Sequence, residues 1–372
     1  MSQRSVPFFN YPALFKNEEA GLTEVVFDVL RRGAYIMQKD NFEFEANLAK
    51  YVGAKHAIGL ADGTNAMVLG FWALDFPKGS EVIMASHTYV ATAGAAHIAG
   101  LKPVLIECGD DHMLDASAIE AAITPLTKAV MPTQLNGRTA NMDAIKAVAK
   151  KHNIVVVEDA AQGLGSKFKG QFAGTFGAFG TISFYPAKLL GCFGDGGALI
   201  TNDDHVAERV RLLRDHGRND NGEFVTWGTN CRLDNVQAAV LNFRLKTFDK
   251  DIARRRQIAS TYQARLAEID DLALPPAPGS EADHFDVFQN YEMESGKRDS
   301  LRDHLKANGI GTLIQWSGQP VHQIKALGLD YHLPKTDRLF KRCFMLPMHV
   351  ALSDEDVDYV CTTIRAFYGL NR

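Results

Sequence analysis

An aspartate and a lysine stand out because their types and settings match one kind of chemistry. Asp159 follows the apolar residues 155–157, a run typical of a buried parallel strand. Lys188 comes just after a second strand-like stretch at residues 179–184. A carboxylate beside a pyridine nitrogen, together with a lysine that forms a Schiff base, is what pyridoxal phosphate chemistry needs. An isolated aspartate usually caps a helix and an isolated lysine is usually a surface charge, so the indication comes from the pair.

A phosphate site is indicated near the start of the chain. Gly63, Thr64 and Asn65 follow a strand and open a helix. A helix N-terminus with small and hydroxyl residues binds phosphate readily, although a capped helix that binds nothing explains this motif equally well on its own. Ser183, at the end of the strand before Lys188, offers another phosphate donor.

Two further segments bear on the cofactor. Tyr89 or His87, which follow a strand at residues 81–84, could cover one face of a pyridine ring, although packing in the core is the commoner role of such side chains. The glycine-rich residues 191–197 fit neither the Gly-x-Gly-x-x-Gly nor the P-loop spacing, so they predict no nucleotide triphosphate site. Tight turning beyond Lys188 is enough to explain them.

The elements that must position these groups alternate between strands and helices. Strands are expected at residues 57–60, 81–84, 103–106, 128–131, 154–157, 180–184 and 198–201. Helical patterns separate most of them, as at residues 64–74, 116–123 and 143–152. This alternation favours an α/β fold with a mostly parallel seven-stranded sheet covered on both faces. Ligands of such sheets bind beyond the carboxyl ends of the strands, where Asp159 falls.

The composition changes after this region. Residues 272–280 are rich in proline and form the clearest linker-like stretch of the chain. Beyond them the pattern predicts a strand near residues 285–292 and helices near residues 298–308 and 354–367. We therefore expect a large cofactor-binding domain at residues 1–250 and a smaller C-terminal α/β domain at residues 251–372.

Composition excludes several classes of protein. The 372 residues are 46% hydrophobic and carry a net charge of −4. This charge gives no sign of a basic surface, so we expect no nucleic-acid partner. The N-terminus lacks a signal-peptide pattern, and no long apolar run predicts a membrane span. The 5 scattered cysteines are typical of reduced thiols in a cytoplasmic enzyme, and the 12 histidines show no metal-ligand spacing, so we expect no metal site.

The motifs taken together resemble those of the DegT/StrS-type sugar aminotransferases. These are fold-type I pyridoxal phosphate enzymes that act on nucleotide-linked keto sugars. The matching segments are residues 63–64, 158–162, 183–188, 194–197, 214–217 and 228–233, and the resemblance covers nearly the whole chain. It implies a pyridoxal phosphate-dependent transferase fold like that of aspartate aminotransferase, with pyridoxal 5′-phosphate as the cofactor.

The resemblance also implies roles for single residues around the cofactor ring. Asp159 pairs with the pyridine nitrogen, and Gln162 lies close to the ring and its hydroxyl. Lys188 is the Schiff-base residue, and Tyr89 stacks on the ring.

Other implied roles concern the phosphate, the partner and the substrate. Thr64 and Ser183 bind the phosphate, and Asn230 reaches the phosphate of a partner subunit, which implies a homodimer with shared active sites. Residues 131–137 depart from the histidine-containing segment of many members and leave the substrate subclass open. The candidate sugar contacts are Tyr185, Trp316 and His322.

The predicted function is an aminotransferase that moves an amino group from an amino acid, glutamate by resemblance, to C4 or C3 of a nucleotide-linked deoxysugar. Its product would feed lipopolysaccharide, capsule, glycoprotein or antibiotic glycans. Two alternatives stay open at this point. One is another fold-type I enzyme, a lyase or desulfurase that acts on a free amino acid. The other is a non-catalytic regulator or sensor that retains the fold.

Overall fold

Two four-stranded sheets form the centre of the computed structural model, which describes residues 4–370. Their strand orders are β3-β2-β4-β5 and β6-β9-β10-β1. The strands are β1 (His56–Leu60), β2 (Glu81–Ala85), β3 (Lys102–Ile106), β4 (Thr127–Val130), β5 (Val155–Val156), β6 (Glu158–Asp159), β9 (Gly180–Ser183) and β10 (Gly197–Thr201).

The two sheets are halves of one sheet because β5 and β6 are parts of a single extended segment. β5 pairs with β4, and β6 pairs with β9, both in parallel. Between them, Val157 donates its amide to the carbonyl of Val130 at 3.1 Å. β10 alone runs antiparallel to both of its neighbours. The prediction of a mostly parallel seven-stranded sheet is therefore confirmed.

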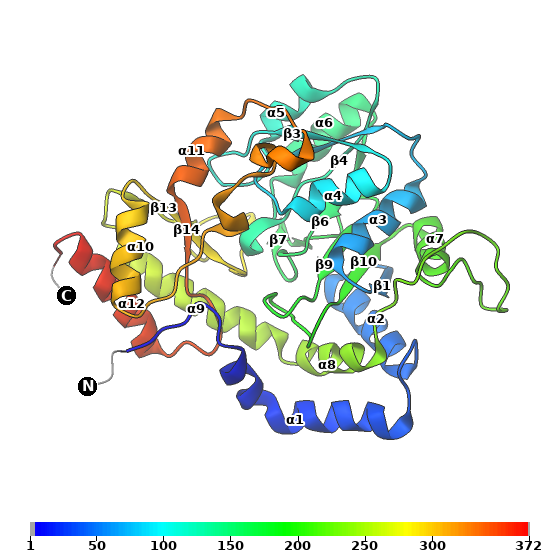
Figure 1. Cartoon of the computed structure of the whole chain (residues 1–372), viewed down its shortest axis with the longest axis horizontal. Helices are drawn as coiled ribbons and strands as arrows, with labels where there is room; N and C mark the ends of the chain where they lie inside the picture. The colour runs from blue at the N-terminus through cyan, green and yellow to red at the C-terminus, as the bar shows by residue number, and fades with distance from the viewer. Residues whose placement is uncertain (1–3, 371–372) are drawn as a thin grey trace.

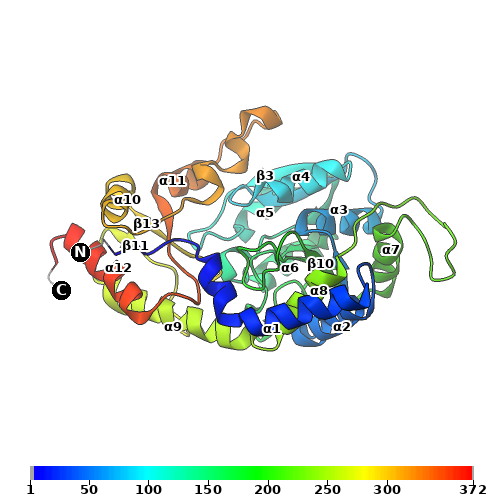
Figure 2. The ribbon, with the colours of Figure 1, turned by 60° about the horizontal axis from the view of Figure 1, so that its bottom comes forward.

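Helices cover both faces of this sheet because apolar side chains point alternately to its two sides. On β2, Val82 and Met84 pack into the cluster with α3 (Gly63–Leu74), and Ile83 and Ala85 pack into the opposite cluster. The first face also carries α4 (Val90–Ile98) and α7 (Asp204–Arg214), and the second carries α2 (Lys39–Val52), α5 (Ala116–Ala122), α6 (Met142–His152) and α8 (Asn235–Leu245). The long helix α1 (Tyr11–Arg32) packs outside α8, as Figure 2 shows.

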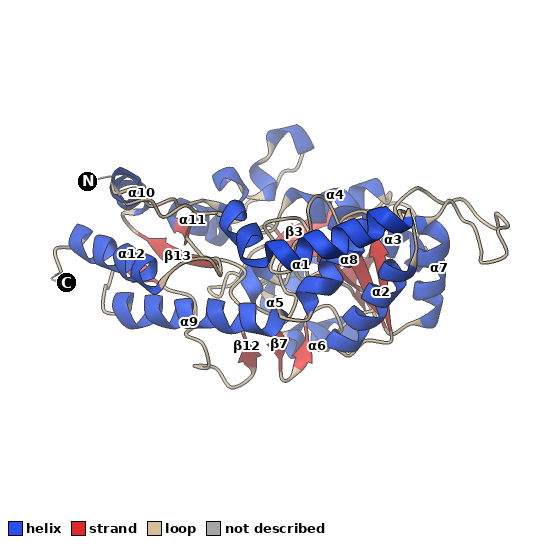
Figure 3. Ribbon diagram, turned by 90° about the horizontal axis from the view of Figure 1, so that it is seen from below, coloured by secondary structure: helices blue, strands red, loops and turns tan. Residues whose placement is uncertain are grey.

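A smaller antiparallel sheet has its own hydrophobic core. Its strands are β11 (Leu272–Ala273), β13 (Tyr291–Ser295) and β14 (Cys343–Leu346), in the order β11-β13-β14. The surrounding helices are α9 (Phe248–Leu266), α10 (Arg298–Ala307), α11 (Pro334–Arg342) and α12 (Asp354–Phe367) (Figures 1 and 3). The N-terminal Val6 packs in the same core and pairs in parallel with Ile310. The domain boundary between residues 250 and 251 stays a prediction.

Two expectations about the C-terminal half differ from the structure. The strand expected near residues 285–292 is wrong, because β12 (His284–Phe285) pairs with β7 (Lys167–Phe168), which also pairs with β8 (Gln171–Phe172), and β13 begins only at Tyr291. Phe288, with φ of 53°, has a left-handed backbone that interrupts any strand. The linker-like residues 272–280 begin with β11, inside the smaller sheet. Within residues 4–370, no helix is both long and apolar enough to cross a membrane.

Candidate active site

A cavity of about 640 Å³ lies where five parallel strands present their carboxyl ends. Its lining residues follow β1, β2, β4, β6 and β9 within a few positions, as Thr64 follows β1 and Ser183 ends β9. The opposite wall comes from the smaller sheet and its loops, including Gln289 and Leu313. The N-terminal segment adds Phe8 and Phe9. The site is therefore built from distant parts of the chain.

Most of the residues singled out in the sequence meet in this cavity. The lining includes Gly63, Thr64, Asn65, Tyr89, Asp159, Gln162, Ser183, Tyr185, Lys188 and Trp316. Three others, His87, His322 and Asn230, do not line it. The His87 ring is buried, with its Nε2 3.6 Å from the Glu292 carboxylate, so it does not cover a ring bound in this cavity. The His322 ring is buried between the Ser86 hydroxyl at 2.7 Å and the Asp337 carboxylate at 2.9 Å. Asn230 is exposed, and its side chain accepts a hydrogen bond from Arg232 at 3.1 Å.

The amino end of α3 forms a cradle for an anion. Asp62 caps the helix by accepting from the amide of Asn65 at 2.8 Å, and it also binds the Asn65 side chain. The amides of Gly63 and Thr64 have no acceptor among the described residues, as expected at a helix start. A Cβ added to Gly63 would lie 3.1 Å from the Cβ of Ser183, so the Ser183 hydroxyl stands beside this helix start. This arrangement fits a phosphate group.

Asp159 is buried at the end of β6 with its carboxylate held on both oxygens. Thr92 of α4 donates to Oδ2 at 2.7 Å, and the Ala161 amide donates to Oδ1 at 3.1 Å. A chain of hydroxyl groups supports Thr92, because Thr88 lies 2.7 Å from it and 2.8 Å from Thr133. These contacts fix the direction of a negative charge on the cavity wall.

Lys188 lies on a turn that is held by Gln289, from the segment between β12 and β13. Gln289 accepts from the amide of Leu189 at 2.6 Å and donates to the carbonyl of Ala187 at 2.8 Å. Burial of the ammonium group lowers the pKa of Lys188 to about 8, against the opposing effect of Asp159. More of the amine is therefore neutral near pH 7 than for an exposed lysine, as a nucleophile or base requires.

Comparison with known proteins identifies this arrangement. Residues 16–365 match the model of the DegT/DnrJ/EryC1/StrS aminotransferase family. The chain belongs to this family. It is a pyridoxal phosphate-dependent aminotransferase, with the α/β fold that the sequence predicts.

Individual relatives are similar to this chain along nearly their whole length. A dTDP-3-amino-3,4,6-trideoxy-alpha-D-glucose transaminase of Streptomyces venezuelae is 38% identical and is matched over 92% of this chain and 91% of its own. A pleiotropic regulatory protein of Geobacillus stearothermophilus is 37% identical over 98% and 99% of the two chains. The structure of S. venezuelae DesV in complex with a ketimine intermediate superposes with a TM-score of 0.94, at 36% identity, over 99% and 100%.

The residues of this aminotransferase fit its cofactor. Bound pyridoxal phosphate supplies a carbon that the lysine amine attacks and a pyridine ring that withdraws electrons from the reacting carbon. The start of α3 and Ser183 would hold the phosphate, and Asp159 would face a protonated ring nitrogen. Lys188, with its lowered pKa, would hold the cofactor and then move the proton.

Several residues of the aminotransferase site were missed by the sequence analysis. Thr92 escaped notice because α4, a short helix that was not predicted, places it against Asp159. Gln289 lies in a segment that was expected to be a strand. Phe8 and Phe9 come from the N-terminus, where no local pattern signals a site. Helical spacing after Tyr89 could have indicated α4, but the others required the folded chain.

Proposed function

We propose that this aminotransferase moves an amino group from L-glutamate to a keto carbon, C3 or C4, of a nucleotide-linked deoxysugar. The names of relatives support the substrate class, since they describe transaminases of dTDP-, UDP- and GDP-linked sugars or enzymes that form such products. The product would supply lipopolysaccharide, capsule, glycoprotein or antibiotic glycans, and we propose a cytoplasmic location for this reaction.

The observation that carries the proposal is the shape and lining of the cavity. Its volume of about 640 Å³ lies in the range of sites for organic ligands, and it has to hold the cofactor as well as the substrate. Aromatic side chains of Phe8, Phe9, Tyr185 and Trp316 line it beside Lys188. Their flat faces suit a sugar ring and a nucleobase.

The charges of the cavity support a second subunit at the site. Among the described lining residues, Lys188 is the one basic side chain, against Asp62, Asp159 and Asp195. A nucleotide diphosphate and a glutamate carboxylate both need cations or many donors, so one chain alone leaves the substrate anions poorly neutralised.

A protruding loop offers the contact that such a dimer needs. The loop between α7 and α8 extends away from the body of the molecule in Figure 1. It exposes 73% of Phe224 and 94% of Trp227, and exposed large apolar side chains of this kind mark an interface. Asn230 and Arg232 follow in the same segment. We propose an isologous homodimer in which this segment reaches the partner's phosphate cradle.

The alternatives noted in the sequence lose support. A lyase or desulfurase is set aside because the chain belongs to an aminotransferase family. The regulatory name of one relative does not favour a non-catalytic protein here, because Lys188, Asp159 and the phosphate cradle all line one cavity.

A panel of substrates tests the proposal. Purified enzyme is incubated with L-glutamate and each of the 3-keto and 4-keto forms of dTDP-, UDP- and GDP-linked deoxysugars, and amino sugar formation is followed by mass spectrometry. We expect one nucleotide and one keto position to dominate, with no product from Lys188→Ala. Efficient transamination of free keto acids alone, with none of the nucleotide sugars accepted, would refute the proposed substrate.

A further inference from the structure

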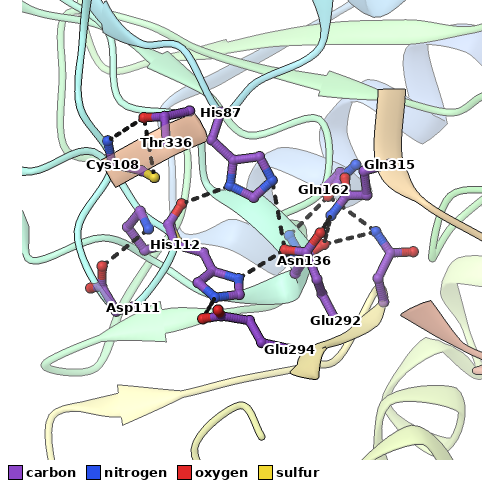
Figure 4. Close-up of polar contacts among 12 residues, drawn as sticks. His87, Cys108, Asp111, His112, Asn136, Gln162, Glu292, Glu294, Gln315 and Thr336 are labelled. Atoms are coloured by element: carbon purple, nitrogen blue, oxygen red, sulfur yellow. Dashed lines mark hydrogen bonds and ion pairs between the residues drawn. The ribbon is translucent and has the colours of Figure 1, made fainter. Parts of the chain in front are cut away.

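The orientation of the Gln162 side chain is fixed by a donor outside the cavity. Its Oε1 lies 2.8 Å from the backbone nitrogen of Asn136, as Figure 4 shows. A backbone N–H can only donate, so the oxygen and not the amide nitrogen must face it. Asn290 donates to the same oxygen at 3.4 Å. The Nε2 group has no acceptor among the described residues, and Gln162 lines the cavity. Gln162 therefore offers the cavity a hydrogen-bond donor.

Asn136 is itself held in an unusual conformation. Its φ of 57° lies in the left-handed region, within the short turn η1 (Leu135–Gly137). The side chain donates to Oε2 of Glu292 at 2.9 Å and accepts from Gln315 at 2.6 Å and from Asn290 at 2.9 Å. Every polar atom of this side chain thus has a partner, which holds the turn that aims its backbone N–H.

Glu292 anchors this network as a buried carboxylate on β13. His112 lies 2.9 Å from Oε2, His87 lies 3.6 Å from the same oxygen, and Gln315 donates to Oε1 at 3.0 Å. Burial raises the pKa of Glu292, but the two histidines outweigh it and hold the pKa well below the usual range.

His112 is the positive partner in this pair. Burial lowers the pKa of His112, but Glu292 and Glu294 outweigh it and raise the pKa to about 10. The pair therefore stays charged across neutral pH, and Glu292 can only accept hydrogen bonds.

We propose that Glu292, acting through Asn136, is a positioning residue that keeps Gln162 oriented as a hydrogen-bond donor to the ring oxygen of the bound cofactor. Neither Glu292 nor Asn136 lines the cavity, so neither is a catalytic residue. The relay joins β13 of the smaller sheet to the turns that follow β4 and β6 of the main sheet. This inference rests on the proposed placement of the cofactor at Lys188.

The absorbance of the bound cofactor, titrated with pH in the absence of substrate, reports this relay. A hydrogen-bond donor to the ring oxygen stabilises the negative charge on that oxygen. The oxygen then holds less tightly the proton that it shares with the nitrogen joined to Lys188, so this proton is lost at a lower pH. Weakening the donor therefore raises the pH midpoint. We expect Glu292→Gln to raise it by roughly one unit, the contribution of one hydrogen bond, because an amide cannot accept from Asn136, His112 and Gln315 together.

Coupling between variants separates this role from a general loss of structure. Gln162→Ala should raise the midpoint at least as much as Glu292→Gln, and the double variant should raise it no further than Gln162→Ala alone. Glu294→Gln is the matched control, because Glu294 lies 3.3 Å from the other nitrogen of His112 and accepts from Arg342 rather than from Asn136. This control should leave the midpoint unchanged.

A second route remains if Glu292→Gln does not fold. Asn136→Gly permits the left-handed backbone and removes the links to Glu292 and Gln315, so it should raise the midpoint in the same direction. Additive shifts in the double variant, or an unchanged midpoint in folded Glu292→Gln or Asn136→Gly, would overturn the inference.

The titration uses no sugar, so it is independent of the proposed substrate. Borohydride labelling of Lys188 in the wild type checks the placement, and an unlabelled lysine would overturn the inference together with that placement.

Discussion

Thr92 donates a hydrogen bond to Asp159, with 2.7 Å between Oγ1 and Oδ2. The two residues belong to different elements, the helix α4 and the strand β6. The hydroxyl of Thr92 also lies 2.7 Å from the Thr88 hydroxyl, and because its own proton goes to Asp159, it accepts the hydrogen bond from Thr88. The direction of the Asp159 charge is therefore set by a helix that packs above the sheet.

The charge of Asp159 is expected to be needed for turnover. Asp159→Asn should retain some cofactor and lose a factor of about 10² or more in kcat, because an amide cannot hold the ring nitrogen protonated. Cofactor content is measured by absorbance and kcat by single-turnover kinetics. Near-normal turnover in this variant would move the partner of the pyridine nitrogen to another residue.

The hydrogen bond from Thr92 should matter less than the charge that it orients. Thr92→Val keeps the shape of the side chain and removes the hydroxyl, so kcat should fall roughly tenfold, as for loss of one hydrogen bond to a charged group. Thr363→Val, which removes a buried hydroxyl that donates within α12, is the matched control and should keep its rate. Equal rates in the two variants would show that Thr92 does not orient Asp159 for catalysis.

The lowered pKa of Lys188 has a consequence for folding stability. The pKa falls from 10.5 to about 8 in the folded chain, so the unfolded chain binds the proton more tightly. The charged lysine therefore costs stability at every pH below 8, and the cost disappears as pH rises from 8 toward 10.5. In cofactor-free protein at pH 7, Lys188→Met should raise the free energy of unfolding, by on the order of 2 kcal/mol.

Urea unfolding at pH 7 and at pH 10 measures this effect. The increase in the free energy of unfolding that Lys188→Met produces should be smaller at pH 10 than at pH 7. The control is Lys250→Met, at an exposed lysine of α9, which should change stability little at either pH. A Lys188→Met protein that is less stable than the wild type at pH 7 would show that the buried charge of Lys188 does not destabilise the folded chain.

Shared active sites can be tested by mixing subunits. Lys188→Ala chains should be inactive, and Asn230→Ala chains should be impaired because the partner's phosphate loses a donor. In a mixed dimer one site carries both defects and the other carries neither, so activity should rise above that of either parent. Failure of rescue, with subunit exchange confirmed by native mass spectrometry, would mean that each chain builds its site alone.

The sequence by itself determined the main sheet and the motifs at its edge. Apolar runs bounded by turn residues predicted the strands of the main sheet to within one to two residues of the observed bounds, as for β1 (His56–Leu60) and β10 (Gly197–Thr201). The final helix, Asp354–Phe367, was predicted with its observed bounds, and Ser353 and Asp356 form a capping box there. These signals are local, because side-chain periodicity and capping depend on neighbours within a few residues.

Only the tertiary structure decided which distant side chains complete the site. Phe9 lines the same cavity as Lys188, and Glu292 reaches Asn136, although no local pattern links either pair. Trp316 enters the cavity and His322, six positions later, turns away to Ser86. Such choices follow from the packing of the smaller sheet against the carboxyl ends of the main sheet, where buried polar groups must find partners that lie far away in the chain.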